Sequence, residues 1–189
     1  MYSNTNYQAP APAPVAPAPQ PMAQGQPQAE PKPKAAPKSK AGDLGGFIQQ
    51  MTSVAAYVHQ LQVQAHLLHL NYEASNFIGI HAFLKDQYEA HLEQFDTIGE
   101  LIRSMDYLMP MCHEGLMAAS PEFKHCTSYK ANDMLMTYYK NLEELGMKAK
   151  KMEQQAAKIQ APDVQNYFAD LCGMAFKAAW FIKASLRNS

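Results

Sequence analysis

Long apolar runs are missing from this chain of 189 residues. A membrane-spanning helix needs about eighteen or more consecutive apolar residues, so we expect no membrane span. The start of the chain lacks the basic segment and apolar core of a secretory signal. Its three cysteines form no Cys-x-x-Cys pair and leave one unpaired, which argues against a disulfide framework. Together these absences predict a cytoplasmic protein with reduced thiols.

Large apolar residues are scarce in residues 1–42, which contain ten of the thirteen prolines. Such a segment cannot bury enough apolar surface to fold, so we expect a disordered tail that is rich in Pro, Ala and Lys. Its last part carries four lysines, at Lys32, Lys34, Lys38 and Lys40. They are candidate contacts for DNA phosphates, which require only charge and reach. The alternative is a solubilising spacer without a binding role.

Residues 43–189 are expected to form one all-α domain, because apolar residues recur there at steps of three and four. Ser120, Pro121 and Glu122 give a good helix start, with a capping hydroxyl, a proline and then an acid. The pattern predicts long helices over about 45–71, 76–106, 120–158 and 162–187, with a short helix near 112–118. Four long helices without a strand indicate a four-helix bundle.

The apolar residues also predict which helix faces are buried. The expected buried face of 76–106 consists of Phe77, Ile80, Leu84, Tyr88, Leu92, Phe95, Ile98 and Ile102. His91 is expected at the surface. Tyr129, Met174 and Trp180 are assigned to the apolar faces of the later helices.

Two histidines and two carboxylates are the candidate metal ligands. His69 and His81 lie six residues on either side of Ser75, so a helical hairpin would bring both imidazoles into one space. Asp96 and Glu100 are four residues apart and share a helix face. This nitrogen and oxygen set suits iron, zinc or manganese.

The spacing of the four ligands requires a second copy of the chain. His81 and Asp96 are fifteen residues apart on one helix, which is roughly 22 Å at 1.5 Å per residue. One ion cannot bridge that distance, whereas a two-fold dimer would pair the histidines of one copy with the carboxylates of the other. A di-iron centre inside one bundle would need two Glu-x-x-His pairs, and only Glu122 and His125 have that spacing. We expect that pair to cap a helix.

The pattern His69, His81, Asp96, Glu100 resembles the ferroxidase motif of the Dps miniferritins. HLNYEASNF around the first helix end and AAWFIKASL near the C-terminus are similar to segments of that family, and Asn71, Phe77, Tyr88 and Ile102 fit as well. The resemblance covers about residues 43–189. It implies a ferritin-like four-helix bundle with a short helix between the second and third long helices. It also implies Fe²⁺ oxidation by hydrogen peroxide at these four residues, a hollow dodecamer with sites at two-fold interfaces, and ferric mineral inside the shell.

Departures from the family pattern leave part of this open. Lys85 stands one turn after His81, where the family often has another acidic ligand, so two irons per site are in question. Leu70, Ala74 and Leu101 replace the usual Trp, Gly and Arg. The main alternative function is a DNA-compacting structural protein with a vestigial or non-iron metal site. Ligands that merely join a dimer or bind zinc are a further alternative.

Overall fold

The computed structural model describes residues 44–187 of the chain. They fall within a single compact unit. The predicted tail of residues 1–42, with its four candidate DNA-binding lysines, lies outside the described residues. Among the described helices, none is long and apolar enough to cross a membrane.

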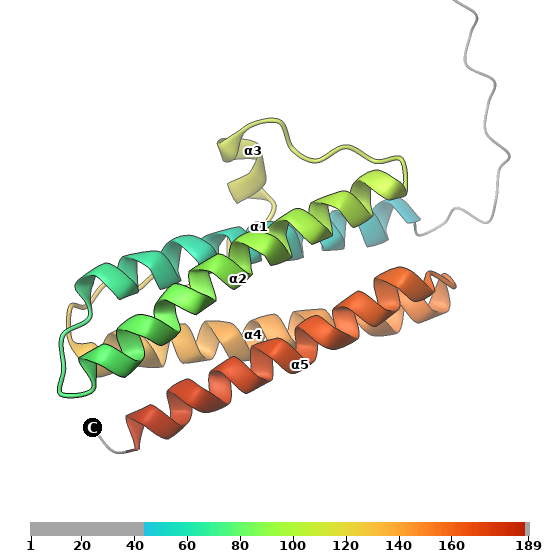
Figure 1. Cartoon of the computed structure of the whole chain (residues 1–189). Helices are drawn as coiled ribbons and strands as arrows, with labels where there is room; N and C mark the ends of the chain where they lie inside the picture. Colours follow the sequence, from blue (N-terminus) through green and yellow to red (C-terminus); the bar gives the residue numbers. More distant parts are fainter. Residues whose placement is uncertain (1–43, 188–189) are drawn as a thin grey trace, which may run out of the picture. The chain divides into compact units, whose positions relative to one another are not determined.

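The described residues form a four-helix bundle, as the sequence predicts (Figure 1). The long helices are α1 (Leu44–Asn71), α2 (Phe77–Ser104), α4 (Ala131–Lys158) and α5 (Pro162–Leu186), and the short helix is α3 (His113–Ala118). Helices α1 and α2 pack as one hairpin, α4 and α5 pack as another, and α1 also contacts α4. The short helix α3 lies in the long connection between the two hairpins and contacts α1.

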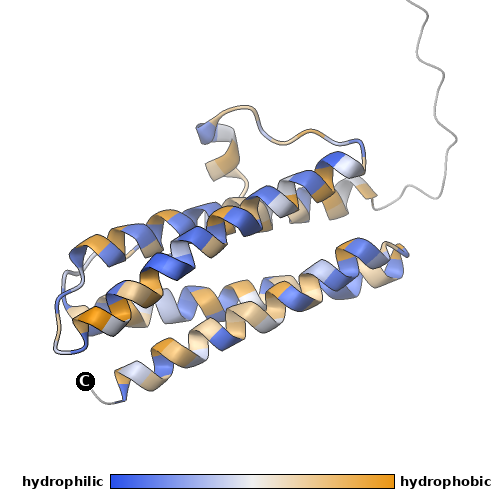
Figure 2. Cartoon of the chain, in the orientation of Figure 1, coloured by the Kyte–Doolittle hydropathy of each residue, from blue (hydrophilic) through white to orange (hydrophobic). Residues whose placement is uncertain are grey.

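The core of the bundle is a stripe of apolar side chains from every long helix. Figure 2 shows apolar and polar residues alternating along each helix, as expected for elements with one buried face. Leu61, Leu84, Leu142 and Phe168, one from each long helix, are fully buried. Burying each such side chain contributes roughly 1.5–3 kcal/mol, so helix packing is the main source of stability.

The turn between α1 and α2 is held by Tyr72 and Asn76. Tyr72 is buried, and its hydroxyl donates a hydrogen bond of 2.7 Å to the side-chain oxygen of Asn76. The backbone N–H of Tyr72 donates to the carbonyl of Leu68, which prolongs the last turn of α1. Fixing this turn sets the register of the hairpin and hence the positions of His69 and His81.

The predicted start of the third long helix at Ser120 is wrong, because α4 begins at Ala131. Residues 121–130 instead run along the bundle outside any helix. Gln60 donates a hydrogen bond to the carbonyl of Ser120, and Gln64 and Asn141 both donate to the carbonyl of Lys124. These tertiary hydrogen bonds outweigh the local capping signal.

The Glu-x-x-His pair lies in the same stretch. Neither Glu122 nor His125 caps a helix, contrary to the expectation, and both side chains are exposed.

Several assignments to buried helix faces are also wrong. Leu92 is 60% exposed and Phe77 is 40% exposed, whereas His91, expected at the surface, is buried. Leu84, His91 and Ile98 are spaced by seven residues and share one face of α2, so Leu92 is turned about 100° away from the core. Tyr129, Met174 and Trp180 are likewise exposed. Tyr129 precedes the first residue of α4.

Candidate metal centre

His69 and His81 face each other across the α1–α2 hairpin, as their spacing predicts. His69 lies in the last turn of α1 and His81 in the second turn of α2. Their rings stack with centroids 3.7 Å apart and an interplanar angle of 21°. Both residues are partly buried.

Reciprocal hydrogen bonds fix the orientation of the two rings. Nδ1 of His69 lies 2.8 Å from the carbonyl oxygen of His81, and Nδ1 of His81 lies 3.0 Å from the carbonyl oxygen of His69. A carbonyl oxygen only accepts, so the proton of each neutral ring resides on Nδ1. Nε2 of both rings therefore keeps its lone pair. Orientation of a ligating histidine by a hydrogen bond to a backbone carbonyl is typical of metal sites.

Aromatic side chains enclose this histidine pair. Phe77 lies against His81 with centroids 4.8 Å apart. Tyr88 contacts His69 edge to face at 5.5 Å and stacks on His66 at 4.3 Å. Packing on both sides limits rotation of the imidazoles, so the pair is ordered before any ligand arrives.

Asp96 and Glu100 lie far from the histidine pair in the same chain. α2 is continuous from Phe77 to Ser104, so the fifteen-residue spacing from His81 to Asp96 corresponds to roughly 22 Å. Both carboxylates are exposed. Within residues 44–187, no group of three or more His, Cys, Asp or Glu side chains could hold a metal ion. One chain thus brings the two histidines together and leaves the two carboxylates elsewhere.

Lys85, which replaces an acidic residue of the family pattern, is paired with Glu89. Lys85 lies one turn after His81 on α2, and its ammonium forms an ion pair with the carboxylate of Glu89, one turn further on. The hydrogen bond to Glu89 is the main cause that raises the pKa of Lys85. The positive charge of Lys85 is therefore partly balanced, but position 85 itself carries no acid.

His91 is the centre of a second polar cluster, inside the bundle. Its Nδ1 lies 2.8 Å from Oε1 of Gln94, and its Nε2 lies 2.9 Å from the hydroxyl of Tyr138 on α4. Gln94 accepts from Nδ1–H, so Tyr138 donates to Nε2. Burial lowers the pKa of His91 to about 4 and raises that of Tyr138. The cluster is therefore neutral at pH 7.

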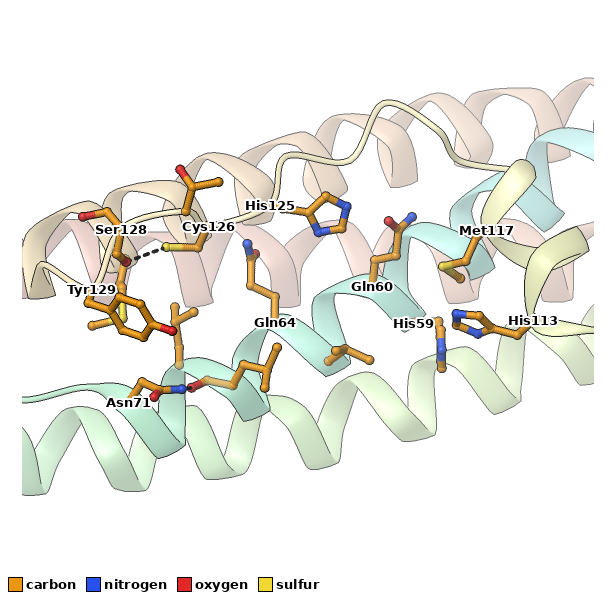
Figure 3. Close-up of a pocket in the computed structure, with 15 residues that line it drawn as sticks. His59, Gln60, Gln64, Asn71, His113, Met117, His125, Cys126, Ser128 and Tyr129 are labelled. Atoms are coloured by element: carbon orange, nitrogen blue, oxygen red, sulfur yellow. Dashed lines mark hydrogen bonds between the residues drawn. The ribbon is translucent and has the colours of Figure 1, made fainter.

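A cavity of about 450 Å³ opens beside α1, and neither His69 nor His81 is among the residues that line it (Figure 3). It is bordered by α1, by α3 and by the segment that precedes α4. His59, His113 and His125 line it, each from a different one of these elements. Burial, and then the neighbouring His113, lower the pKa of His59. The sequence interpretation assigned no role to His113, and the short helix that carries it gave no ligand pattern.

Comparison with protein families identifies the class of this bundle. The model of the ferritin-like domain matches residues 48–189. The chain belongs to the ferritin-like family. Comparison with curated proteins found no match.

Solved structures share the fold at low sequence identity. Antigen TpF1 from Treponema pallidum has a TM-score of 0.72 and 21% identity, covering 80% of this chain and 97% of that one. Dps from Listeria innocua, in crystals soaked with zinc, has a TM-score of 0.70 and 16% identity over 74% and 95%. Dps from Vibrio cholerae O1 is described as a member of a broad superfamily of ferritin-like diiron-carboxylate proteins. It has a TM-score of 0.69 and 15% identity, covering 75% of this chain and 89% of that one. The predicted ferritin-like four-helix bundle is thus confirmed.

Proposed function

We propose that this protein is a cytoplasmic, iron-storing miniferritin that oxidises Fe²⁺ at sites shared between two copies of the chain. Each site takes His69 and His81 from one copy and Asp96 and Glu100 from its two-fold partner. The observation that carries the proposal is the pair of reciprocal hydrogen bonds that leaves both Nε2 lone pairs free. Membership of the ferritin-like family supports iron as the metal.

The ligand types divide the chemistry between them. Neutral imidazole nitrogens bind Fe²⁺ without a charge of their own, and the carboxylates stabilise the additional charge of Fe³⁺. Hydrogen peroxide is the proposed oxidant, with dioxygen less effective. Two Fe²⁺ ions each lose one electron, the O–O bond of one peroxide breaks, and two protons complete two water molecules.

One tightly held iron per ligand set is the proposed occupancy. Lys85 supplies no oxygen donor, and its ammonium, although paired with Glu89, opposes a further cation nearby. A second Fe²⁺ would therefore bind more weakly than the first, and this weakly held ion would supply the second electron that the peroxide needs.

Assembly into a hollow dodecamer with ferric mineral inside completes the proposal. Exposed apolar side chains on the hairpin of α1 and α2 support burial in an assembly. Leu67 and Leu70, on either side of His69, are 53% and 66% exposed, and Ile78 is 83% exposed.

Mixing two inactive variants tests the shared site directly. Chains with His69→Gln and His81→Gln lose one half of the ligand set, and chains with Asp96→Asn and Glu100→Gln lose the other half. Each variant alone should bind no Fe²⁺ tightly and should oxidise it only at the background rate. After mixed refolding, half of the dimers are mixed and each has one intact site, so about one quarter of the wild-type activity returns. The recovered activity is measured as ferric absorbance that appears after peroxide is added.

Three results would contradict the proposal. No recovery in mixtures that are shown to contain mixed dimers would disprove the shared site. Wild-type activity in the Asp96→Asn, Glu100→Gln variant would show that these carboxylates are not ligands. Tight binding of Zn²⁺ without any iron oxidation would favour the alternative of a structural, non-iron site.

A second proposed function is non-specific DNA binding by the N-terminal tail. The supporting observation is the sequence EPKPKAAPKSK, which contains four lysines, Lys32, Lys34, Lys38 and Lys40, and only one acid, Glu30. Four charges per chain are modest, but repetition around a dodecamer would make later contacts intramolecular.

Removal of residues 1–42 separates the two functions. The truncated protein should keep peroxide-dependent iron oxidation and lose DNA binding in a gel-shift assay. Because counterion release drives such contacts, the affinity of the full-length protein should fall steeply as salt rises from about 50 to about 200 mM. DNA affinity that is unchanged by truncation or by salt would contradict the proposal and favour a spacer role for the tail.

A further inference from the structure

Three side chains outside the stacked histidine pair gather at one end of the cavity beside α1. His59 extends from α1, while His113 and Met117 extend from α3 (Figure 3). His113 and Met117 are four residues apart on α3 and therefore share one helix face. Two imidazoles and one thioether thus converge from two elements that are distant in sequence.

The distance between the two rings suits a shared ion. The centroids of His59 and His113 are 5.8 Å apart, with an interplanar angle of 72°. A metal bound at about 2.0–2.1 Å from a ring nitrogen lies about 3.2 Å from the ring centroid. Two rings that hold one ion therefore have centroids at most about 6.4 Å apart, and this pair lies within that limit.

The charge of the cavity selects the kind of ion. None of the residues that line it is Asp or Glu. A divalent cation would enter without a counter-charge, and the desolvation cost would be poorly offset. A thioether is a soft ligand, poorly suited to Mg²⁺, Mn²⁺ or Fe²⁺. Neutral donors that include one soft thioether match a monovalent soft cation.

We propose that His59, His113 and Met117 form a binding site for Cu⁺, one per chain. The site is separate from the proposed iron site in residues and in chemistry. It binds through neutral nitrogen and sulfur, whereas the iron site depends on carboxylates. Its cavity of about 450 Å³ leaves room for Cu⁺ to enter past the exposed His113.

Anaerobic titration with Cu⁺ against bicinchoninate tests the site. The three cysteines are first replaced by serine, because thiolates would bind Cu⁺ themselves. This protein should bind about one Cu⁺ per chain, and X-ray absorption should show nitrogen and sulfur ligands. His59→Asn or His113→Asn should weaken binding roughly tenfold or more, and Met117→Leu should remove the sulfur signal while preserving side-chain volume.

Two controls make the result specific. His125→Asn changes another histidine of the same cavity and should leave Cu⁺ affinity unchanged. His69→Gln with His81→Gln removes the proposed iron ligands and should also leave it unchanged, so the two proposals fail separately. Absence of saturable Cu⁺ binding in the cysteine-free protein would overturn the inference. So would binding that survives His113→Asn and Met117→Leu, or that is lost in either control.

Discussion

His91 shows how one residue couples the bundle to pH. In the folded chain it stays neutral down to a pKa of about 4, while in the unfolded chain it takes up a proton near its ordinary value of 6.5. Between these values the unfolded state binds more protons, so stability falls as the pH is lowered from about 6.5 to about 4. At about 1.4 kcal/mol per pH unit, the loss is about 3 kcal/mol.

Urea unfolding followed by circular dichroism, at fixed chain concentration, measures this loss. His91→Gln removes the titrating group but keeps a polar side chain, so the variant should lack this component of the pH dependence. An identical pH dependence in wild type and variant would show that His91 is not its source.

The positions of His91 and of the pair His69 and His81 were partly predictable from the sequence. The seven-residue spacing Leu84, His91, Ile98 marks His91 as a core position, although its polarity suggested the surface. The proximity of His69 and His81 followed from their symmetry about Ser75. The reciprocal hydrogen bonds did not, because they depend on backbone carbonyls that no residue type identifies.

At the scale of elements, Gly146 lets α4 and α5 approach closely. A Cβ added at this position would meet ring atoms of Phe176 at 2.8 to 2.9 Å, closer than carbon atoms pack. Gly146→Ala should therefore lower the free energy of unfolding by about 1 kcal/mol, despite the better helix propensity of alanine.

The matched background is Phe176→Ala, which removes the ring. There, Gly146→Ala should raise stability by about 1 kcal/mol, because only the propensity effect remains. Thermal or urea unfolding of the four proteins measures the coupling. A stabilising effect of Gly146→Ala with Phe176 present would mean that the ring moves aside at little cost.

The helix boundaries show where local signals succeed and fail. The ends of α1, α2, α3 and α5 agree closely with the sequence pattern, because periodicity and Pro162 mark them. The start of α4 does not. Ser120, Pro121 and Glu122 form a local capping pattern, but Gln60, Gln64 and Asn141 hold this stretch outside any helix. Those partners are distant in sequence, so local reasoning could not identify them.

At the scale of the whole molecule, the exposed apolar surface of the α1–α2 hairpin predicts dependence of activity on assembly. Leu70→Asp places a charge next to His69 without removing any of the four proposed ligands. Burying that charge in an interface is costly, so the variant should form smaller species in analytical ultracentrifugation and lose iron oxidation.

Gln154→Asp is the matched control, because it adds the same charge at an exposed polar position on α4. It should leave both assembly and activity near wild type. Full assembly of the Leu70→Asp protein would show that this surface is not an interface.

The length of α2 between His81 and Asp96 determines when a newly made chain can become active. Under the proposed function, a newly made and fully folded copy cannot carry out the reaction, because no single molecule closes a ligand set around an ion. Chemistry begins only when two copies meet, so the onset of activity rises with the square of chain concentration while copies are scarce. Synthesis and reactivity are thereby separated in time, and isolated chains release no partly reduced oxygen.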